Sequence, residues 1–114
     1  MIIAIIPFRD RHAQLETLVT LLKNRKDIDL IHVIEQTPGL PFNRGWVRNI
    51  GALVSNVKQA TLYFIDVDLY ITPNFQNFKQ LPLDVALHCY GHPHCLGTLF
   101  GIRVETFIKI ILRF

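Results

Sequence analysis

The first 34 residues alternate two apolar runs with one helical pattern, and this order constrains the fold more than any other feature. Residues 2–6 form a continuous, mostly β-branched run closed by Pro7, which is typical of a strand buried on both faces. Apolar residues then recur with the i, i+3, i+4, i+7 spacing of an amphipathic helix, namely Leu15, Leu18, Val19 and Leu22. Residues 28–34 give a second strand. The opening is therefore β-α-β, whose right-handed crossover makes the strands parallel.

The next part of the chain repeats this pattern. Residues 37–41 contain two prolines and a glycine, which predict a loop, and Asn43 suits the N-cap of a second helix. The apolar residues of that helix trace one face: Trp46, Val47, Ile50, Leu53, Val54 and Val57. Residues 61–65 predict a third strand, 84–88 a fourth, 96–102 a fifth, and 104–112 a last helix. We expect an α/β fold, Rossmann-like, with a mostly parallel sheet flanked by helices.

Composition narrows the class of protein. With 114 residues, the chain has the size of one small domain. Half the residues are hydrophobic, which is rich for this size and predicts that some apolar surface lies against a partner or a further segment. The net charge of +3 comes with dispersed arginines, which suits a small anionic ligand. Because no nucleic-acid motif is present, we expect no nucleic-acid partner.

The sequence also bears on the compartment. No apolar run approaches the roughly 18 residues that span a bilayer, and the N-terminus lacks the order of a signal peptide. Two cysteines are too few for a disulfide scaffold. We therefore expect a cytoplasmic protein.

Two carboxylates after the third predicted strand carry the main chemical signal. Asp66 and Asp68 follow the run 61–65, so the strand delivers them to the carboxyl edge of the sheet, where open α/β folds bind ligands. Such oxygen ligands suit Mg²⁺ or Mn²⁺ better than zinc, and an ion there would hold a diphosphate. A solvated turn or a helix N-cap remains the alternative.

Two further motifs are expected at the same edge. They are Pro7-Phe8-Arg9-Asp10-Arg11 after the first strand and Phe42-Asn43-Arg44 before the second helix. The arginines suit diphosphate oxygens, and Arg44 adds charge at a helix start already suited to anions. Phe8 and Phe42 suit the walls of a base or ribose site. In the plainer interpretation, the arginines only neutralise Asp10 and Asp66, and the phenylalanines belong to the core.

In this order, the three motifs resemble the β-1,4-galactosyltransferases and their relatives, inverting glycosyltransferases of the GT-A fold. The likeness extends from residue 2 to about 71 and includes Phe64-Ile65-Asp66-Val67-Asp68-Leu69. It implies a nucleotide-sugar-binding GT-A fold, a UDP-sugar donor (UDP-galactose or UDP-GalNAc) and Mn²⁺, with Mg²⁺ as a substitute. The implied donor contacts are Pro7, Phe8, Arg9, Arg11, Phe42, Arg44, Asp66 and Val67, and the implied metal ligand is Asp68.

The resemblance changes toward the C-terminus. Residues 85–87 and Gly97-Thr98 resemble the family's next strand and turn, but the Trp-Gly-Trp-Gly-Gly-Glu-Asp motif, which supplies the acceptor platform and catalytic base, is absent. The resemblance therefore implies that residues 1–114 are one domain, the truncated N-terminal, donor-binding half of a galactosyltransferase-like catalytic domain. No catalytic residue is assigned, because Asp66 and Asp68 are committed to metal or sugar. Since the family includes Golgi-resident members with a membrane anchor, the resemblance and the lack of an anchor in this sequence together imply a cytoplasmic protein of bacterial or viral type.

Two classes of function follow. The first is a glycosyltransferase that moves the sugar of a UDP-sugar to a glycan acceptor with inversion, a reaction that needs a base for the acceptor hydroxyl. The second is a non-catalytic nucleotide-sugar-binding or protein-interaction module that kept the half-fold. The apolar tail from residue 107 predicts self-association or a partner surface.

The histidines and cysteines give weaker signals. Four potential zinc ligands, Cys89, His92, His94 and Cys95, fall within seven residues, a cluster too tight to surround one tetrahedral ion, so we expect a polar loop. His12 and His32 are expected to be surface residues or hydrogen-bonded core residues.

Overall fold

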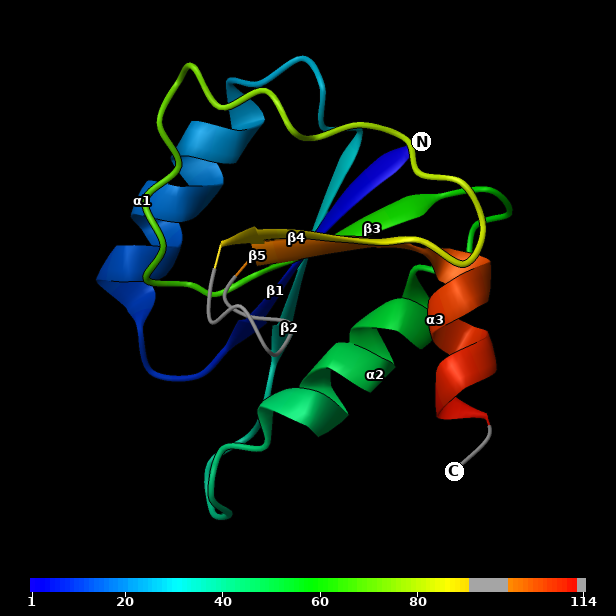
Figure 1. Cartoon of the computed structure of the whole chain (residues 1–114). Coiled ribbons are helices and arrows are strands. Elements are labelled where there is room, and N and C mark those ends of the chain that lie inside the picture. The colour runs from blue at the N-terminus through cyan, green and yellow to red at the C-terminus, as the bar shows by residue number, and fades with distance from the viewer. Residues whose placement is uncertain (91–98, 113–114) are drawn as a thin grey trace.

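The apolar run at the N-terminus forms strand β1 (Ile2–Phe8), and every residue of this strand is buried. A computed structural model of the chain describes residues 1–90 and 99–112, and β1 lies inside a five-stranded sheet of order β2-β1-β3-β5-β4 (Figure 1). The other elements are α1 (His12–Lys23), β2 (Leu30–Glu35), α2 (Arg44–Val54), β3 (Thr61–Ile65), β4 (Ala86–Tyr90), β5 (Leu99–Arg103) and α3 (Val104–Ile111).

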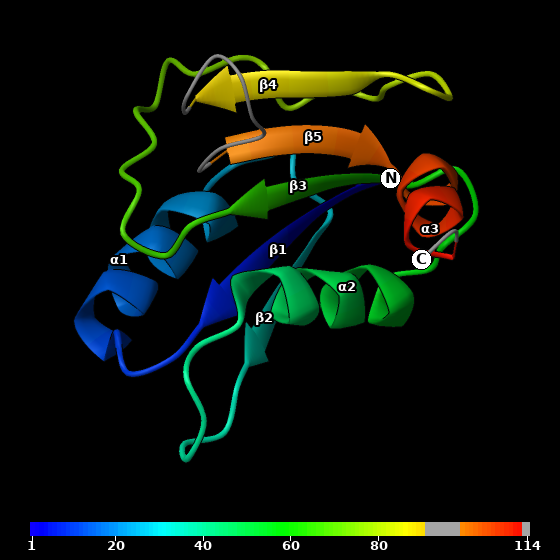
Figure 2. The same ribbon diagram turned by 60° about the horizontal axis from the view of Figure 1, so that its bottom comes forward.

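The sheet is mixed, and one strand is reversed. β1 pairs in parallel with β2 and β3, whereas β5 runs antiparallel to both β3 and β4. Four of the five strands therefore point the same way, as Figure 2 shows. The two predicted crossovers are confirmed, because α1 connects β1 to β2 and α2 connects β2 to β3.

Helices cover both faces of the sheet. Alternate residues of β1 point to opposite sides, so Ile2, Ala4 and Ile6 share a core with Leu18 and Leu22 of α1. The other core contains Ile3, Ile5, Ala52 of α2 and Val104 of α3. Figure 1 accordingly shows α1 on one side of the sheet and α2 with α3 on the other. The predicted α/β fold is confirmed.

The topology creates a ligand-binding edge. The chain leaves β1 toward β2 on one side and returns to β3 on the other side of β1. At such a switch point, the loops that follow the two neighbouring strands diverge and leave a crevice at the carboxyl ends. The loops after β1 and β3, which carry two of the three motifs, lie at this edge.

Helix α2 begins as predicted but is turned differently. Asn43 caps it, because the Trp46 amide donates to Asn43 Oδ1 at 3.0 Å. Only part of the apolar face seen in the sequence points to the core: Val47 is buried, whereas the side chains of Trp46, Leu53 and Val54 are more than half exposed. The residues toward the sheet include Val47, Gly51 and Ala52, which are buried.

Glycine is needed where α2 crosses β1. A Cβ on Gly51 would lie 2.6 Å from Ile5 Cγ2 and 3.3 Å from Ile34 Cγ1, so only the bare backbone fits this crossing. Close approach of this helix face turns the apolar stripe of Trp46, Leu53 and Val54 outward.

Tyr63 holds the irregular segment 66–85, between β3 and β4, against the sheet through hydrogen bonds. The hydroxyl of Tyr63 lies 2.9 Å from the Asn77 carbonyl and 2.6 Å from the Lys79 carbonyl, and it accepts from the Lys79 amide at 2.9 Å. Phe78 packs edge-on against the Tyr63 ring. The segment thus covers the α1 side of the sheet, which keeps Tyr63 fully buried.

Several weaker predictions have definite outcomes. His32 Nδ1 lies 2.6 Å from Ser55 Oγ, and His12 is an exposed residue whose ring packs edge-on against Phe8, which agrees with the predicted hydrogen-bonded and surface histidines. Strands β4 and β5 are present with shifted limits. His92, His94, Cys95, Gly97 and Thr98 lie outside the described residues, and Cys89 is a free, half-buried cysteine in β4.

The C-terminal helix keeps part of its apolar surface outside. Ile110 and Leu112 are exposed, so self-association through this tail stays a prediction. Among the described residues, no helix has the length and apolar character to cross a membrane.

Candidate functional site

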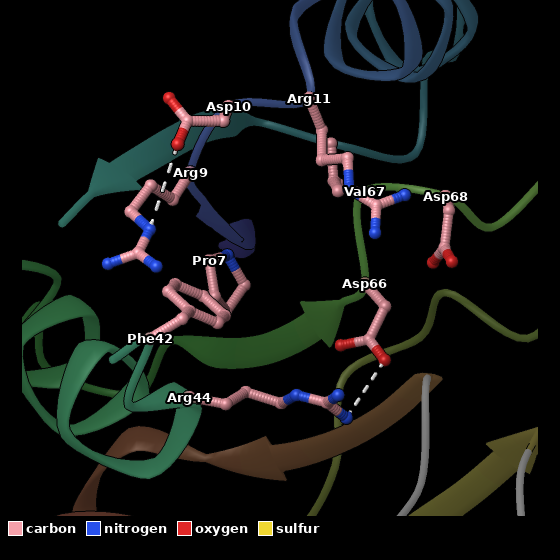
Figure 3. A pocket seen from close by; sticks show the side chains of 9 residues that line it. All are labelled: Pro7, Arg9, Asp10, Arg11, Phe42, Arg44, Asp66, Val67 and Asp68. Carbon is pink, nitrogen blue, oxygen red and sulfur yellow. Dashed lines mark hydrogen bonds and ion pairs between the residues drawn. The ribbon is translucent and has the colours of Figure 1, made fainter. Parts of the chain in front are cut away.

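A cavity of about 520 Å³ opens at the carboxyl edge, where the three motifs meet (Figure 3). Its volume is in the range that holds a small-molecule ligand. It is lined by Pro7, Arg9, Asp10, Arg11, Phe42, Arg44, Asp66, Val67 and Asp68. Eight of these nine residues are those singled out above as donor or metal contacts, and Asp10 is the addition.

Phe8 is the one predicted contact that does not line this cavity. Its side chain is buried and packs edge-on against His12, with ring centroids 5.1 Å apart. Because neighbouring residues of a strand point to opposite faces, Pro7 and Phe8 cannot both turn to the same side. The structure thus gives the Phe8 side chain a packing role.

Gln36 fastens the loop that carries Phe42 and Arg44. This side chain is buried; its Nε2 donates to the Pro41 carbonyl at 3.0 Å, and its Oε1 accepts from the Asn43 amide at 2.8 Å. Together with the Asn43 cap, these bonds fix the start of α2 beside the loop after β1. The sequence alone did not single out Gln36, because a lone glutamine carries no pattern.

Asp66 lies between two arginines of α2. Arg44 Nη1 donates to Asp66 Oδ2 at 3.1 Å, and Arg48 Nη2 donates to Asp66 Oδ1 at 3.4 Å. Figure 3 shows the first of these bonds. Arg48 was missed as a site residue, although its i+4 spacing from Arg44 puts both on one helix face. Arg44 therefore neutralises Asp66, as the plainer interpretation proposed, and also lines the cavity.

Burial sets the electrostatics of this group. The pKa of Asp66 is raised by burial, although Arg44 and Arg48 act in the opposite direction. The pKa of Arg48 is lowered by burial, and the charge of Asp66 opposes that shift. The carboxylate of Asp66 is thus compensated by its two arginines, and it is less available as a metal ligand than an unpaired carboxylate.

Asp68 has the opposite setting. It is exposed, and it has no hydrogen bond or ion pair with any residue that the structure describes. A bond from the Leu69 amide to the Asp66 carbonyl, 3.1 Å long, closes the turn that presents it. An exposed carboxylate without a partner fits a Mg²⁺ or Mn²⁺ ion, which binds through one or two carboxylates plus substrate phosphates.

The part of the chain that the structure describes offers no complete set of protein ligands for a metal ion. Within residues 1–90 and 99–112, no group of three or more His, Cys, Asp or Glu side chains is placed to hold a metal ion. A diphosphate would offer further oxygens to an ion bound at Asp68.

The remaining cations surround the opening. The Arg9 guanidinium stacks over the Phe42 ring at 5.9 Å, donates to the Leu40 carbonyl, and lies 3.9 Å from Asp10 Oδ2. Figure 3 shows Arg11 pointing toward the turn of Asp66 and Asp68. Arg9, Arg11 and Arg44 thus face one space, which suits a ligand with several negative oxygens.

Comparison with known proteins identifies the family. Residues 1–79 match the model for the N-terminal region of glycosyl transferase group 7. The chain belongs to glycosyl transferase group 7. Its relatives include β-1,4-galactosyltransferase 5 of Sus scrofa and β-1,4-galactosyltransferase 6 of Homo sapiens, each 31% identical over 93% of this chain and 31% of the relative. The chain thus spans about a third of the length of these relatives, and the resemblance seen in the motifs is confirmed.

Solved structures support the same family. The catalytic domain of Drosophila β1,4-galactosyltransferase 7 in complex with xylobiose superposes with a TM-score of 0.72 and 26% identity, over 96% of this chain and 51% of that domain. A mutant of that enzyme in complex with manganese, UDP-Gal and xylobiose also gives a TM-score of 0.72, at 25% identity. The group 7 chain therefore has the fold of part of a galactosyltransferase catalytic domain.

The expected cellular setting is wrong. The relatives are animal galactosyltransferases, so the chain does not group with bacterial or viral cytoplasmic proteins. The error came from treating the lack of an apolar leader as evidence of compartment.

Proposed function

We propose that this chain is the donor-binding part of a glycosyltransferase and binds a UDP-sugar with Mn²⁺ in the cavity at the carboxyl edge. The observation that carries the proposal is the convergence of three arginines, one aromatic ring and three aspartates from three separate motifs on one space of about 520 Å³. UDP-galactose and UDP-GalNAc are the proposed donors, as the galactosyltransferase relatives suggest.

Each lining residue has a proposed role. Arg9, Arg11 and Arg44 bind diphosphate oxygens, for which a planar guanidinium is well suited. Phe42 and Pro7 form an apolar wall against the base or ribose, and Asp66 with Val67 meets the sugar. These roles place the charged part of the ligand between the arginines and Asp68.

Asp68 is the proposed metal ligand, with Mg²⁺ as a substitute for Mn²⁺. When bound, the ion would offset the negative charge that builds on the departing diphosphate. The protein supplies the exposed carboxylate, and Asp66, held by Arg44 and Arg48, keeps its own charge compensated. Metal affinity should therefore depend on the nucleotide.

Transfer to a glycan acceptor with inversion is the wider form of the proposal. It needs a base for the acceptor hydroxyl, and in the described part of the chain Asp66 is already paired. We propose that residues 1–114 form the donor-binding unit and that the acceptor side belongs to the part of the catalytic domain that these residues do not match. The alternative is a module that binds nucleotide sugar without transferring it.

Calorimetric titration of UDP tests donor binding. The wild-type protein is expected to bind UDP in the presence of Mn²⁺. EDTA should lower the affinity for UDP at least about tenfold, and Asp68→Ala should lower it by a similar factor, because each removes a charge-assisted contact. Asp84→Asn is a matched control: Asp84 is a largely exposed aspartate that pairs with Lys109, and its positive φ suits asparagine.

Two outcomes separate the two functions. Transfer of labelled galactose from UDP-Gal to xylobiose, the sugar seen with the Drosophila enzyme, would establish an enzyme. Metal-dependent UDP binding without transfer would favour the binding module. A folded protein that binds no UDP under any of these conditions would contradict both.

A further inference from the structure

The two arginines that meet Asp66 sit in different surroundings. The side chain of Arg44 is 53% exposed and lines the cavity, whereas that of Arg48 is 15% exposed and is not part of the lining. Each arginine takes its own oxygen of the carboxylate, Oδ2 for Arg44 and Oδ1 for Arg48. One partner is therefore open to a ligand, and the other is enclosed by protein.

Asp66 and Phe100 both contact Arg48 within the described part of the chain. Besides its bond to Asp66, its guanidinium lies 5.2 Å from the centroid of the Phe100 ring of β5. A cation over an aromatic face is stabilised more when it is largely shielded from water, and the Arg48 side chain is 15% exposed. The Phe100 ring in turn stacks on Phe64 of β3, with centroids 5.0 Å apart. Arg48 is thus fixed to the two strands next to the turn that carries Asp66 and Asp68.

Arg44 can exchange its partner at low cost. An ion pair with one exposed member contributes little, because water already solvates the arginine. A phosphate offers it a stronger, bidentate contact. If Arg44 moved to a ligand, however, the carboxylate of Asp66, whose side chain is only 13% exposed, would need another counter-charge, since an uncompensated charge in such a place is strongly unfavourable.

We infer that Arg48 is a positioning residue that keeps Asp66 compensated and in place, so that Arg44 is released to bind the diphosphate of the donor. The inference rests on the proposed donor site. The two arginines have different roles: Arg48 stays paired with Asp66, and Arg44 exchanges Asp66 for the ligand. Without Arg48, Arg44 would stay on Asp66 and the ligand would lose its contact.

A double-mutant cycle on UDP affinity tests this division. In the presence of Mn²⁺, Arg44→Met and Arg48→Met are each expected to weaken UDP binding about tenfold, the effect of one charge-assisted contact. The double variant should bind about as weakly as either single one, because both changes remove the same contact of Arg44. Losses that multiply to about a hundredfold would mean that Arg48 acts independently, and would overturn the inference.

Two further variants separate positioning from general support of the fold. Arg48→Lys keeps the positive charge beside Asp66 but loses the planar guanidinium over the Phe100 ring, so its affinity for UDP is expected to lie between those of the wild type and Arg48→Met. Arg103→Met removes a similarly buried arginine, 18% exposed and paired with Glu105 at the opposite edge of the sheet, and should leave UDP affinity unchanged. A loss in Arg103→Met equal to that in Arg48→Met would contradict a specific role.

A measurement without ligand distinguishes failure of this inference from failure of the donor site. Urea unfolding should show coupling between Arg48→Met and Asp66→Asn of at least about fivefold in the unfolding constant, and coupling between Arg44→Met and Asp66→Asn below about twofold. Equal couplings would overturn the inference alone. A wild-type protein that binds no UDP would contradict the proposed function and, with it, the release of Arg44.

Discussion

Helices α1 and α2 both cross between parallel strands, yet they turn different kinds of faces to the sheet. α1 follows its apolar pattern and buries Leu18 and Leu22 in the core that contains Ile2, Ala4 and Ile6. α2 buries Val47, Gly51 and Ala52 against the sheet, places Arg44 and Arg48 beside Asp66, and leaves an apolar stripe outside. α1 thus obeys the hydrophobic pattern, and α2 departs from it.

The difference shows what the carboxyl edge requires. Asp66 is half-buried and needs cations, and the only nearby helix that supplies them in the described part of the chain is α2. Placing both arginines on that side leaves room for little apolar bulk, so Gly51 and Ala52 make the close approach. The orientation of α2 therefore follows from the site, and that of α1 from the core.

The largest expected effect is on the α1 side. Leu22 is 1% exposed, so Leu22→Ala should lower the free energy of unfolding by about 3 kcal/mol through lost burial and a cavity. Urea unfolding measures the change. A loss below about 1 kcal/mol would mean that α1 is not packed as described.

The second largest effect is the pH dependence of stability that arises from Tyr63, which is buried on the α1 side of the sheet. Burial raises the pKa of Tyr63 to about 12, whereas an unfolded tyrosine ionises near pH 10. Between these values the folded state keeps a proton that the unfolded state has released, so stability falls as pH rises. The contribution is complete below about pH 10 and its loss is on the order of 2 kcal/mol by pH 12.

Unfolding measured across that pH window checks this expectation. In Tyr63→Phe the slope should become shallower, because no phenol remains to titrate at this position. An unchanged slope would show that other groups cause it.

In α2, two glycine-to-alanine substitutions should change the free energy of unfolding in opposite directions. Gly51→Ala is expected to cost about 1 kcal/mol, because the overpacking against Ile5 outweighs the better helix propensity of alanine. Gly45→Ala on the same helix would meet its nearest atom at 3.7 Å and should stabilise by up to about 1 kcal/mol. Thermal and urea unfolding of the two variants measures these changes. A stabilisation by both substitutions would contradict the close packing of Gly51 against β1.

The smallest effect belongs to the outer stripe of α2. Leu53→Gln and Val54→Gln should each change the free energy of unfolding by less than about 0.5 kcal/mol, since both side chains are already largely exposed. Light scattering on the same samples tests self-association. A destabilisation above 1 kcal/mol would show that this face is covered in solution.

The sequence predicted the parts of the fold that follow from local patterns. The buried run of β1, the period of α1 and the cap at Asn43 need only neighbouring residues to be recognised. The motif residues around the cavity were also predicted, because three loops at one sheet edge must meet. The orientation of α2 was not predictable in this way, since its apolar stripe gives the stronger pattern. Arg48 and Gln36 were missed because their roles depend on distant partners, Asp66 and the Pro41 carbonyl.

The direction of the reversed strand β5 could not be predicted from the sequence either. Its apolar residues indicate a buried strand, but a strand pattern carries no direction. The pairing of Leu62 with Ile102 and of Phe64 with Phe100 in antiparallel register arises from the tertiary structure alone.

The most direct test of the donor site is to locate bound Mn²⁺ by paramagnetic broadening in amide NMR spectra, with UDP present and Mg²⁺ as the diamagnetic reference. The account predicts that signals of residues 9–11, 44 and 66–68 broaden first, and that Asp68→Ala abolishes the effect. Broadening centred elsewhere, or none in the presence of UDP, would contradict the placement of the metal and the diphosphate at this edge of the sheet.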